Sequence, residues 1–141
     1  MPAPSKAPEP VGAYPAARRI GNLLFLSGQG PRQRGSRSIP GVTLDAAGNM
    51  LSYDMEAQVR AVFQNVRHVI EENGSSWDRI VDVTCFLTDL PRDFAVYNRV
   101  YGELFPTGPS QPCRTTIGIH SLPQGGDAPI AFEVKVIAEL S

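Results

Sequence analysis

Two helix-like segments, each preceded and followed by strand-like runs, are the feature that most constrains the fold of this chain. Over residues 54–72 the apolar residues recur at the spacing of a single helix face. A second helical pattern covers residues 91–105, with Pro91 in its first turn. The strand-like runs are residues 16–20, 23–27, 80–87, 114–119 and 130–140. The predicted order of elements is therefore ββαβαββ.

This order predicts an α+β fold in which a mixed sheet carries both helices on one face. A helix between two strands implies a crossover to a parallel neighbour, and such crossovers are right-handed, which places both helices on the same side. The opposite face then has no cover of its own. On the last strand it would present five residues of mixed polarity: Ala131, Glu133, Lys135, Ile137 and Glu139. Because a half-apolar sheet face does not usually stay bare, we expect other copies of the chain to cover it.

Turn-forming residues divide these elements within a single domain, residues 1–141. The chain includes 13 glycines and 13 prolines, a share above that of ordinary globular proteins, so the helices and strands should be short and clearly separated. Residues 1–13 are rich in Pro and Ala and are expected to be extended. Residues 32–53 are predicted to be a long loop insertion, and a loop of about 20 residues in a compact domain usually forms a lid or a binding site.

Charge and cysteine content argue against several classes of protein. With 13 basic and 14 acidic residues the net charge is −1, which disfavours a nucleic-acid or membrane-surface partner. Cys85 and Cys113 do not form a CxxC pair, and neither has a histidine at metal-ligand spacing, so we expect two reduced thiols and no metal. The first ten residues lack the apolar run of a signal peptide, and a cytoplasmic location is expected.

Two charged residues stand in strands where apolar residues are expected. Arg114 begins a strand, and strand alternation places Thr116 and Gly118 on its side. Its guanidinium either pairs with a carboxylate of the protein or, in the concavity that these small neighbours leave, binds a planar carboxylate of a ligand. Glu133 lies among β-branched and aromatic residues. It either pairs with Lys135 or a cross-strand partner, or acts at a subunit interface as a proton acceptor for a water molecule.

Other polar residues give weaker signals. Asn98 follows Phe94 by four residues, so it is predicted on the inner side of the second helix, where it fixes a loop or lines a site. Tyr14 and Ser27 adjoin turn-forming residues. Cys113 has no histidine nearby in the sequence to activate it, which disfavours a nucleophilic role.

Four segments, in this order along the chain, match one known pattern. They are LSGQ at 26–29, DFAVYNRVY at 93–101, PCRTT at 112–116 and FEVKVIA at 132–138. Together they resemble the RidA/YjgF family, the reactive intermediate deaminases. The resemblance extends over nearly the whole chain, from residue 14 to residue 138.

The resemblance implies a chorismate-mutase-like fold and a homotrimer, or a dimer of trimers, with active sites in clefts between subunits. It also implies hydrolysis of 2-imino or enamine acids to 2-oxo acids and ammonia, without a cofactor. Arg114 matches the arginine that grips the substrate carboxylate, and Glu133 matches the glutamate that positions and activates the attacking water. The two side chains are expected to converge on one pocket. The remaining matching or adjacent cleft positions are Tyr14, Ser27, Asn98, Cys113 and Thr116, the last being Cys in many members.

The long 32–53 segment, with its three arginines, resembles the 2-aminomuconate deaminase branch of the family. That resemblance implies a dicarboxylate enamine substrate, 2-aminomuconate, and the product 4-oxalocrotonate (2-oxo-3-hexenedioate). The second carboxylate of this substrate needs a cation of its own. The candidates are Arg18, Arg32, Arg34, Arg37 and His120. The other interpretation of the loop arginines is that they are merely solvated.

Three alternatives stay open at this point. The first is a general deaminase for 2-imino acids and enamines produced in amino acid metabolism. The second is a non-catalytic protein that binds small carboxylates in the same cleft, which would need Arg114 but not Glu133. The third is RNA cleavage, an activity attributed to some relatives, against which the net charge of −1 argues.

Overall fold

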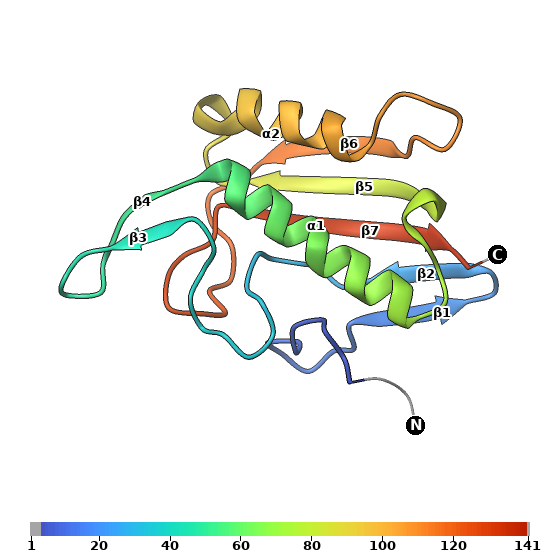
Figure 1. Ribbon diagram of the computed structural model, residues 1–141, viewed down its shortest axis with the longest axis horizontal. Coiled ribbons are helices and arrows are strands. Elements are labelled where there is room, and N and C mark those ends of the chain that lie inside the picture. Colours follow the sequence, from blue (N-terminus) through green and yellow to red (C-terminus); the bar gives the residue numbers. More distant parts are fainter. Residues whose placement is uncertain (1–3, 141) are drawn as a thin grey trace.

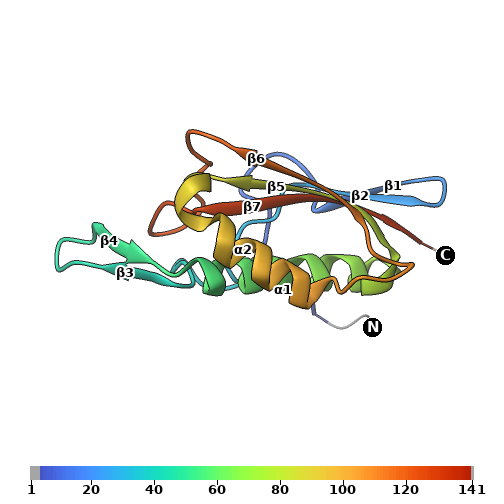
Figure 2. The same cartoon turned by 90° about the horizontal axis from the view of Figure 1, so that it is seen from above.

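A computed structural model describes residues 4–140 of the chain. Five strands form one sheet in the order β1-β2-β7-β5-β6, and two helices lie across one of its faces (Figures 1 and 2). The sheet strands are β1 (Ala17–Ile20), β2 (Leu23–Leu26), β5 (Ile80–Leu87), β6 (Cys113–Gly118) and β7 (Phe132–Glu139). The helices are α1 (Met55–Glu72) and α2 (Leu90–Leu104), with a short 3-10 helix, η1 (Trp77–Arg79), before β5.

The predicted α+β fold, with two helices over a mixed sheet, is confirmed. Strands β5 and β6 are parallel, whereas the β1–β2, β2–β7 and β5–β7 pairs are antiparallel. Strand β6 is one edge of the sheet and β1 is the other. The edge view of the sheet in Figure 2 shows both helices on the same side. No helix within residues 4–140 has the length and apolar character needed to cross a membrane.

Residues 32–53 were predicted to be a long loop insertion, but the second half of this segment contains regular structure. A two-stranded hairpin, β3 (Val42–Leu44) and β4 (Met50–Tyr53), lies there and projects beyond the end of the sheet (Figure 1). Its turn is held by Asp45, whose Oδ1 accepts from the backbone N–H groups of Ala47 and Asn49 at 2.9 and 2.8 Å. Gly48 adopts φ 86°, a conformation that favours glycine. The strands are short, so the alternation that marks a hairpin in sequence is too brief to detect.

Helix α1 follows its predicted pattern and adds two buried amides. Asp54 caps the helix by accepting from the N–H groups of Glu56 and Ala57. Gln58 and Asn65 are completely buried on the apolar side. Gln58 Oε1 accepts from the Ala131 N–H at 2.9 Å, just before β7, and Asn65 Nδ2 donates to the carbonyls of two residues that follow β2. These bonds fix the helix to the segments that border the candidate site.

The predicted inner face of α2 is partly wrong. Phe94 is 41% exposed and Asn98 is exposed, whereas Tyr97, Val100 and Tyr101 are buried. Asp93 lies on the inner side of the helix instead: it is buried, and its Oδ2 accepts a hydrogen bond of 2.6 Å from Tyr53 Oη of the β3–β4 hairpin. A tertiary hydrogen bond of this kind cannot be read from the periodicity of the helix.

An aromatic cluster fills the core between the helices and the sheet. Phe63 of α1 lies at its centre, with ring centroids 5.3 to 6.0 Å from those of its four neighbours, in tilted and edge-on arrangements. The neighbours are Trp77, Tyr101, Phe105 and Phe132.

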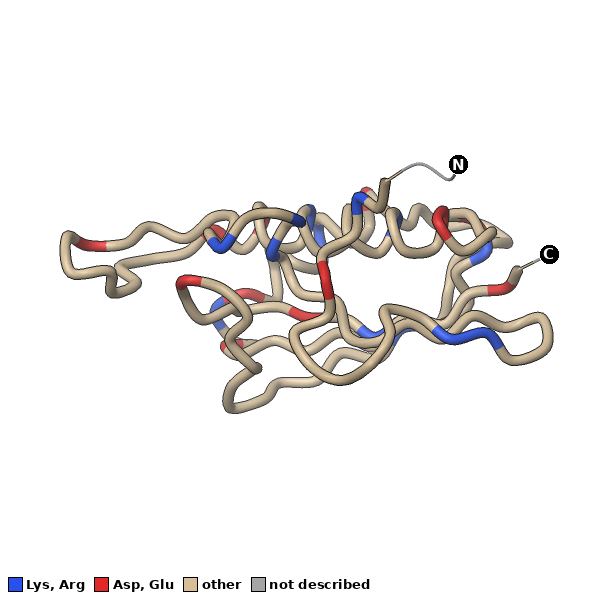
Figure 3. The backbone as a smooth tube through the Cα atoms, turned by 90° about the horizontal axis from the view of Figure 1, so that it is seen from below, with Lys and Arg blue, Asp and Glu red and all other residues tan. Residues whose placement is uncertain are grey.

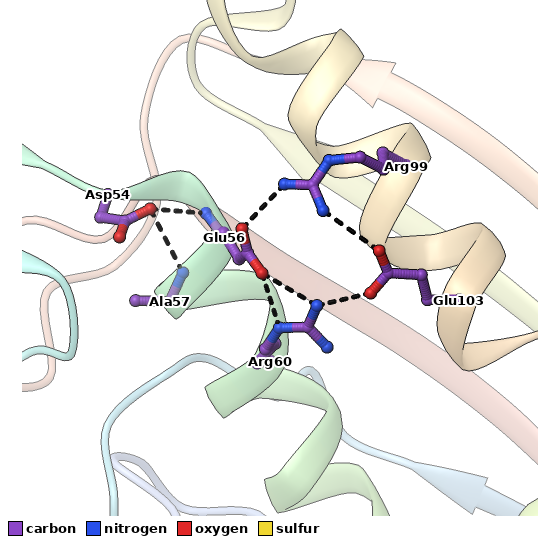
Figure 4. A network of polar contacts seen from close by, with 6 residues as sticks. All are labelled: Asp54, Glu56, Ala57, Arg60, Arg99 and Glu103. Atoms are coloured by element: carbon purple, nitrogen blue, oxygen red, sulfur yellow. Dashed lines mark hydrogen bonds and ion pairs between the residues drawn. The ribbon is translucent and has the colours of Figure 1, made fainter.

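On the outer surface an ion-pair network joins the two helices. Glu56 of α1 pairs with Arg60 of the same helix and with Arg99 of α2, and both arginines also pair with Glu103 (Figure 4). These side chains are largely exposed to solvent, where each single ion pair contributes little to stability.

Candidate active site

A cavity of about 420 Å³ opens beside β7, on the sheet face that the helices leave uncovered. Its walls are the N-terminal segment before β1, the segment that follows β2, and the start of β7. The polar and charged residues that line it include Glu9, Tyr14, Ser27, Arg32, Glu133 and Lys135. Two of the predicted cleft residues, Tyr14 and Ser27, are thus brought together with Glu133.

Glu133 is the chemically distinctive group of this cavity. Strand alternation turns it away from the helices, because Phe132 and Val134 on either side are fully buried beneath them. Its carboxylate is half-buried, and among residues 4–140 no Lys, Arg or His forms an ion pair with it. Burial raises the pKa of Glu133 above its ordinary value. A carboxylate in this state is suited to exchange protons with a bound water.

Gly28 allows the chain to pass directly over this carboxylate. A Cβ at residue 28 would collide with Glu133 Oε2, so any side chain there would displace the acid. The adjacent Ser27 hydroxyl donates its proton to the Pro15 carbonyl at 2.6 Å, and its Oγ can still accept a hydrogen bond from a ligand. Tyr14 is 43% exposed and lines the cavity.

Two loop arginines hold the N-terminal wall of the cavity in place. Arg32 Nη2 donates to the Glu9 carbonyl at 2.8 Å, and Arg34 Nη1 donates to the Ala7 carbonyl at 2.8 Å. Arg34 also pairs with the Glu9 carboxylate at 3.4 Å. Arg37 pairs with Asp127 at 3.0 Å. None of the three is merely solvated, and of the three Arg32 alone lines the cavity.

Arg114 belongs to a second cluster, between β6 and α2. Its guanidinium carbon lies 4.7 Å from the Tyr101 ring centroid and 5.3 Å from that of Tyr97, and its Nη1 donates to Asn98 Oδ1 at 2.9 Å. Thr116 shares a hydrogen bond of 2.6 Å with Tyr97 Oη. Within residues 4–140 Arg114 has no carboxylate partner, and its side chain is exposed. It therefore keeps donors available for an anion.

The expected convergence of Arg114 and Glu133 is not found within one chain. The strand register pairs Arg114 with Val83 of β5, which is fully buried under the helices, whereas Glu133 pairs with Phe86, three residues further along β5. Residues paired across neighbouring strands point to the same face of a sheet, and residues an odd number of positions apart on one strand point to opposite faces. Because Val83 and Phe86 are three positions apart, their partners Arg114 and Glu133 project from opposite faces of the sheet. A pocket that contains both needs two copies of the chain.

Three further candidate residues lie outside the 420 Å³ cavity. Cys113 is exposed and faces the opposite side of β6 from Arg114. His120 lines a separate cavity of about 180 Å³ beside Tyr53. Arg18 is exposed on β1, where it pairs with Phe25 on the uncovered face.

Sequence reasoning did not identify Gly28 or Lys135 as parts of the site. Lys135 lines the same cavity as Glu133. The available signal was its position two residues after Glu133, which places both on the same face of a strand. Gly28 lies within the LSGQ segment that carries the family resemblance, but its contact with Glu133 spans 105 positions in the chain and leaves no local signal.

Comparisons with known proteins place this geometry in context. The family model described as endoribonuclease L-PSP matches residues 4–140. A RutC family protein of Pyrococcus abyssi is 34% identical over 133 residues, covering 94% of this chain and 91% of the relative. Protein HMF1 of Saccharomyces cerevisiae is 35% identical over 132 residues, covering 94% and 88%. The crystal structure of E. coli TdcF with bound serine superimposes with a TM-score of 0.79 at 29% identity, covering 99% of this chain and 97% of that one.

Proposed function

Because the chain belongs to the endoribonuclease L-PSP family, which is also called the RidA/YjgF/RutC family, we propose that it is a hydrolytic deaminase. It converts a 2-imino or enamine acid to the 2-oxo acid and ammonia without a cofactor. The observation that carries this proposal is the half-buried Glu133 carboxylate, which faces a cavity of about 420 Å³ without a cation to pair with it in the described part of the chain.

The proposed chemistry uses one carboxyl group in every proton transfer. Glu133 takes a proton from a water as the water oxygen attacks the carbon of the protonated imine, which gives a neutral carbinolamine. The same carboxyl then delivers a proton to the nitrogen. As the C–N bond breaks and ammonia leaves, the carbinolamine hydroxyl gives its proton back to the Glu133 carboxylate and the C=O bond forms. A raised pKa suits both steps, because it brings the protonated and ionised forms of Glu133 closer in free energy near neutral pH.

Arg114 binds the carboxylate next to the reacting carbon in this proposal, and it comes from a neighbouring copy of the chain. Two surfaces support this arrangement. The uncovered sheet face exposes apolar side chains, with Ile20, Leu23 and Ile117 at 59%, 38% and 39% exposure. The β6 edge carries an exposed Arg114 with unused donors. A closed homotrimer would bring the edge of one chain to the cavity of the next and cover the apolar face at the same time.

The substrate that we favour is 2-aminomuconate, which would yield 4-oxalocrotonate. As an enamine it reaches the electrophilic imine by tautomerisation, and its two carboxylates suit a site with more than one cation. A general 2-imino acid deaminase is the alternative, and the bound serine in E. coli TdcF shows that a relative accommodates a small amino acid. The ratio of kcat/KM for 2-aminomuconate to that for 2-iminopropionate separates the two substrates.

RNA cleavage and carboxylate sensing are less well supported. Basic and acidic residues are interspersed along the backbone rather than gathered into one basic stripe (Figure 3), and the net charge is −1. A sensor would have no need of an acid with a raised pKa in its pocket. Ammonia release by protein freed of ribonuclease contamination, with no cleavage of RNA, is the outcome expected of the deaminase.

Mixing two inactive variants tests the shared site directly. Arg114→Ala and Glu133→Gln should each lower kcat/KM by about 100-fold or more, since each removes an interaction made in the transition state. After the two variants are unfolded and refolded together, trimers that contain both would have one intact site. Random mixing would restore roughly a quarter of wild-type turnover, because about three in four trimers are mixed and each has one active site in three.

Each variant refolded alone is the control and should stay inactive. Native mass spectrometry of differently tagged chains verifies that mixed oligomers form. Mixed oligomers without recovered activity would contradict a site built from Arg114 of one chain and Glu133 of another.

A further inference from the structure

We propose that Lys135 binds a second anionic group of the substrate and thereby makes the site selective for dicarboxylic over monocarboxylic acids. This inference rests on the proposed function, because it assigns a specificity-determining residue to the same cavity. Lys135 lines that cavity together with Glu133. It was not among the five cations that the sequence suggested for a second carboxylate.

The spacing along β7 fits a six-carbon dicarboxylate. Glu133 and Lys135 are two residues apart on one face of the strand, so their Cα atoms are separated by about 6.5 to 7 Å. In an extended six-carbon diacid, the C2 carbon and the far carboxyl carbon are four C–C bonds, or about 5 Å, apart. A substrate whose C2 lies next to the water at Glu133 therefore extends its far carboxylate toward the flexible Lys135 side chain.

Lys135 also keeps hydrogen-bonding capacity that a ligand could use. Its Nζ donates to the Leu26 carbonyl at 2.5 Å, and the ammonium has two further N–H groups. Arg32 instead directs its guanidinium to the carbonyls of Glu9 and Ser36 and lies 3.9 Å from the Glu9 carboxylate. Because Glu9 lies next to Arg32, the other charged residues that line the cavity are Glu133 and Lys135. In the proposed reaction Glu133 acts on the water, which leaves Lys135 for a second carboxylate.

A purely structural role is the competing explanation, because the bond to Leu26 ties β7 to the end of β2. The two roles differ in what they affect. A structural lysine would alter stability and would weaken every ligand equally. A lysine that reads the second carboxylate would discriminate between ligands that differ in that group alone.

Two unreactive acids of equal length provide the test. Muconate and sorbate are both six-carbon dienoic acids, and muconate has one more carboxylate. Isothermal titration calorimetry on the wild-type oligomer should show tighter binding of muconate than of sorbate. Lys135→Met should weaken muconate binding by roughly 10- to 100-fold, the range for a hydrogen bond to a charged group, and should change sorbate binding by less than about twofold. Lys135→Arg should keep most of the preference.

Arg19→Met is the matched control. It removes one positive charge from an exposed site on β1 that does not line the cavity, so it should leave both affinities unchanged. Equal loss of muconate and sorbate binding in Lys135→Met, no preference in the wild-type protein, or failure of the wild-type protein to bind either acid would each overturn the inference. Because these are binding measurements, a protein that prefers muconate through Lys135 but releases no ammonia from either 2-aminomuconate or 2-iminopropionate would disprove the deaminase and leave this inference standing.

Discussion

The two faces of the central sheet differ in almost every physical respect. The face under the helices carries Leu24, Leu26, Val83 and Val136, none more than 2% exposed, and it completes an apolar core. The opposite face carries exposed Ile20 and Leu23 beside acidic, basic and hydroxyl side chains. The helices of the same chain cover the first face, whereas the second face is half-apolar and uncovered.

The difference separates stability from chemistry. On the helix-covered side the Gln58 side chain is fixed to the backbone, because its Oε1 accepts from the Ala131 N–H at 2.9 Å. On the open face Glu133 keeps a partly buried carboxylate without a fixed partner, which lowers stability and is retained where a reacting group is needed. We infer that the core sets the fold of each chain and that the open face sets assembly and reactivity. Three predictions test this division, in order of decreasing expected effect.

The largest loss of stability is expected from the covered face. Phe63→Ala would leave a cavity at the centre of the aromatic cluster and should lower the free energy of unfolding by about 3–5 kcal/mol. Phe94→Ala is the matched control, since Phe94 is 41% exposed on α2, and it should cost far less. Urea unfolding followed by circular dichroism measures both. Similar losses for the two variants would mean that the core does not determine the stability of the chain.

An intermediate effect, confined to assembly, is expected from the open face. Leu23→Lys places a charge in the apolar part of that face, opposite Glu139 in the β1–β2–β7 register, so the single chain tolerates it. We expect the oligomer to dissociate to single folded chains in multi-angle light scattering, with far-ultraviolet circular dichroism unchanged. Gln64→Lys adds the same charge to the exposed side of α1 and should not alter the measured mass. An unaltered oligomer in Leu23→Lys would show that the open sheet face is not the interface.

The sequence was most informative about the covered face. The 3.6-residue period of α1 and the alternation in β5 and β7 report burial against one apolar layer, so these elements were predicted nearly to their ends. The β3–β4 hairpin was missed because its strands have 3 and 4 residues, too few for an alternation to stand out. The inner position of Asp93 on α2 was missed because its partner, Tyr53, is 40 residues away in the sequence.

The open face was harder to interpret from sequence because its residues act across separate segments or separate chains. Glu133 and Arg114 stood out in the sequence as charged residues within strands. In the structure Glu133 lines the cavity of about 420 Å³, and Arg114 is exposed with donors available for an anion. Their positions on opposite faces follow from the register of β5 with its two neighbours, which the sequence does not encode locally. The loop arginines are predicted either to bind a second carboxylate or to be solvated, whereas Arg34 donates to the backbone carbonyl of Ala7 in the N-terminal segment. Long-range contacts of this kind leave no periodic signal.

The smallest predicted effect on stability concerns Glu133 itself, and its sign is opposite to that of a core residue. Because burial raises the pKa of Glu133 above its ordinary 4.5, the folded chain binds this proton more tightly than the unfolded chain does. The stability gained from the protonated carboxyl is fully present below about pH 4.5 and is lost as the pH rises through the folded-state pKa.

Glu133→Gln removes that loss. In urea unfolding followed from about pH 4 to about pH 8, the variant should therefore gain stability relative to wild type as the pH rises above 4.5 and through the folded-state pKa, while losing turnover. Glu139→Gln, which alters an exposed acid on the same face of β7, should not gain stability with rising pH. Urea midpoints for the three proteins across this range provide the measurement, and a Glu133→Gln variant that becomes less stable than wild type as the pH rises would mean that the Glu133 carboxylate is held by a structural partner and is not kept free for a reaction.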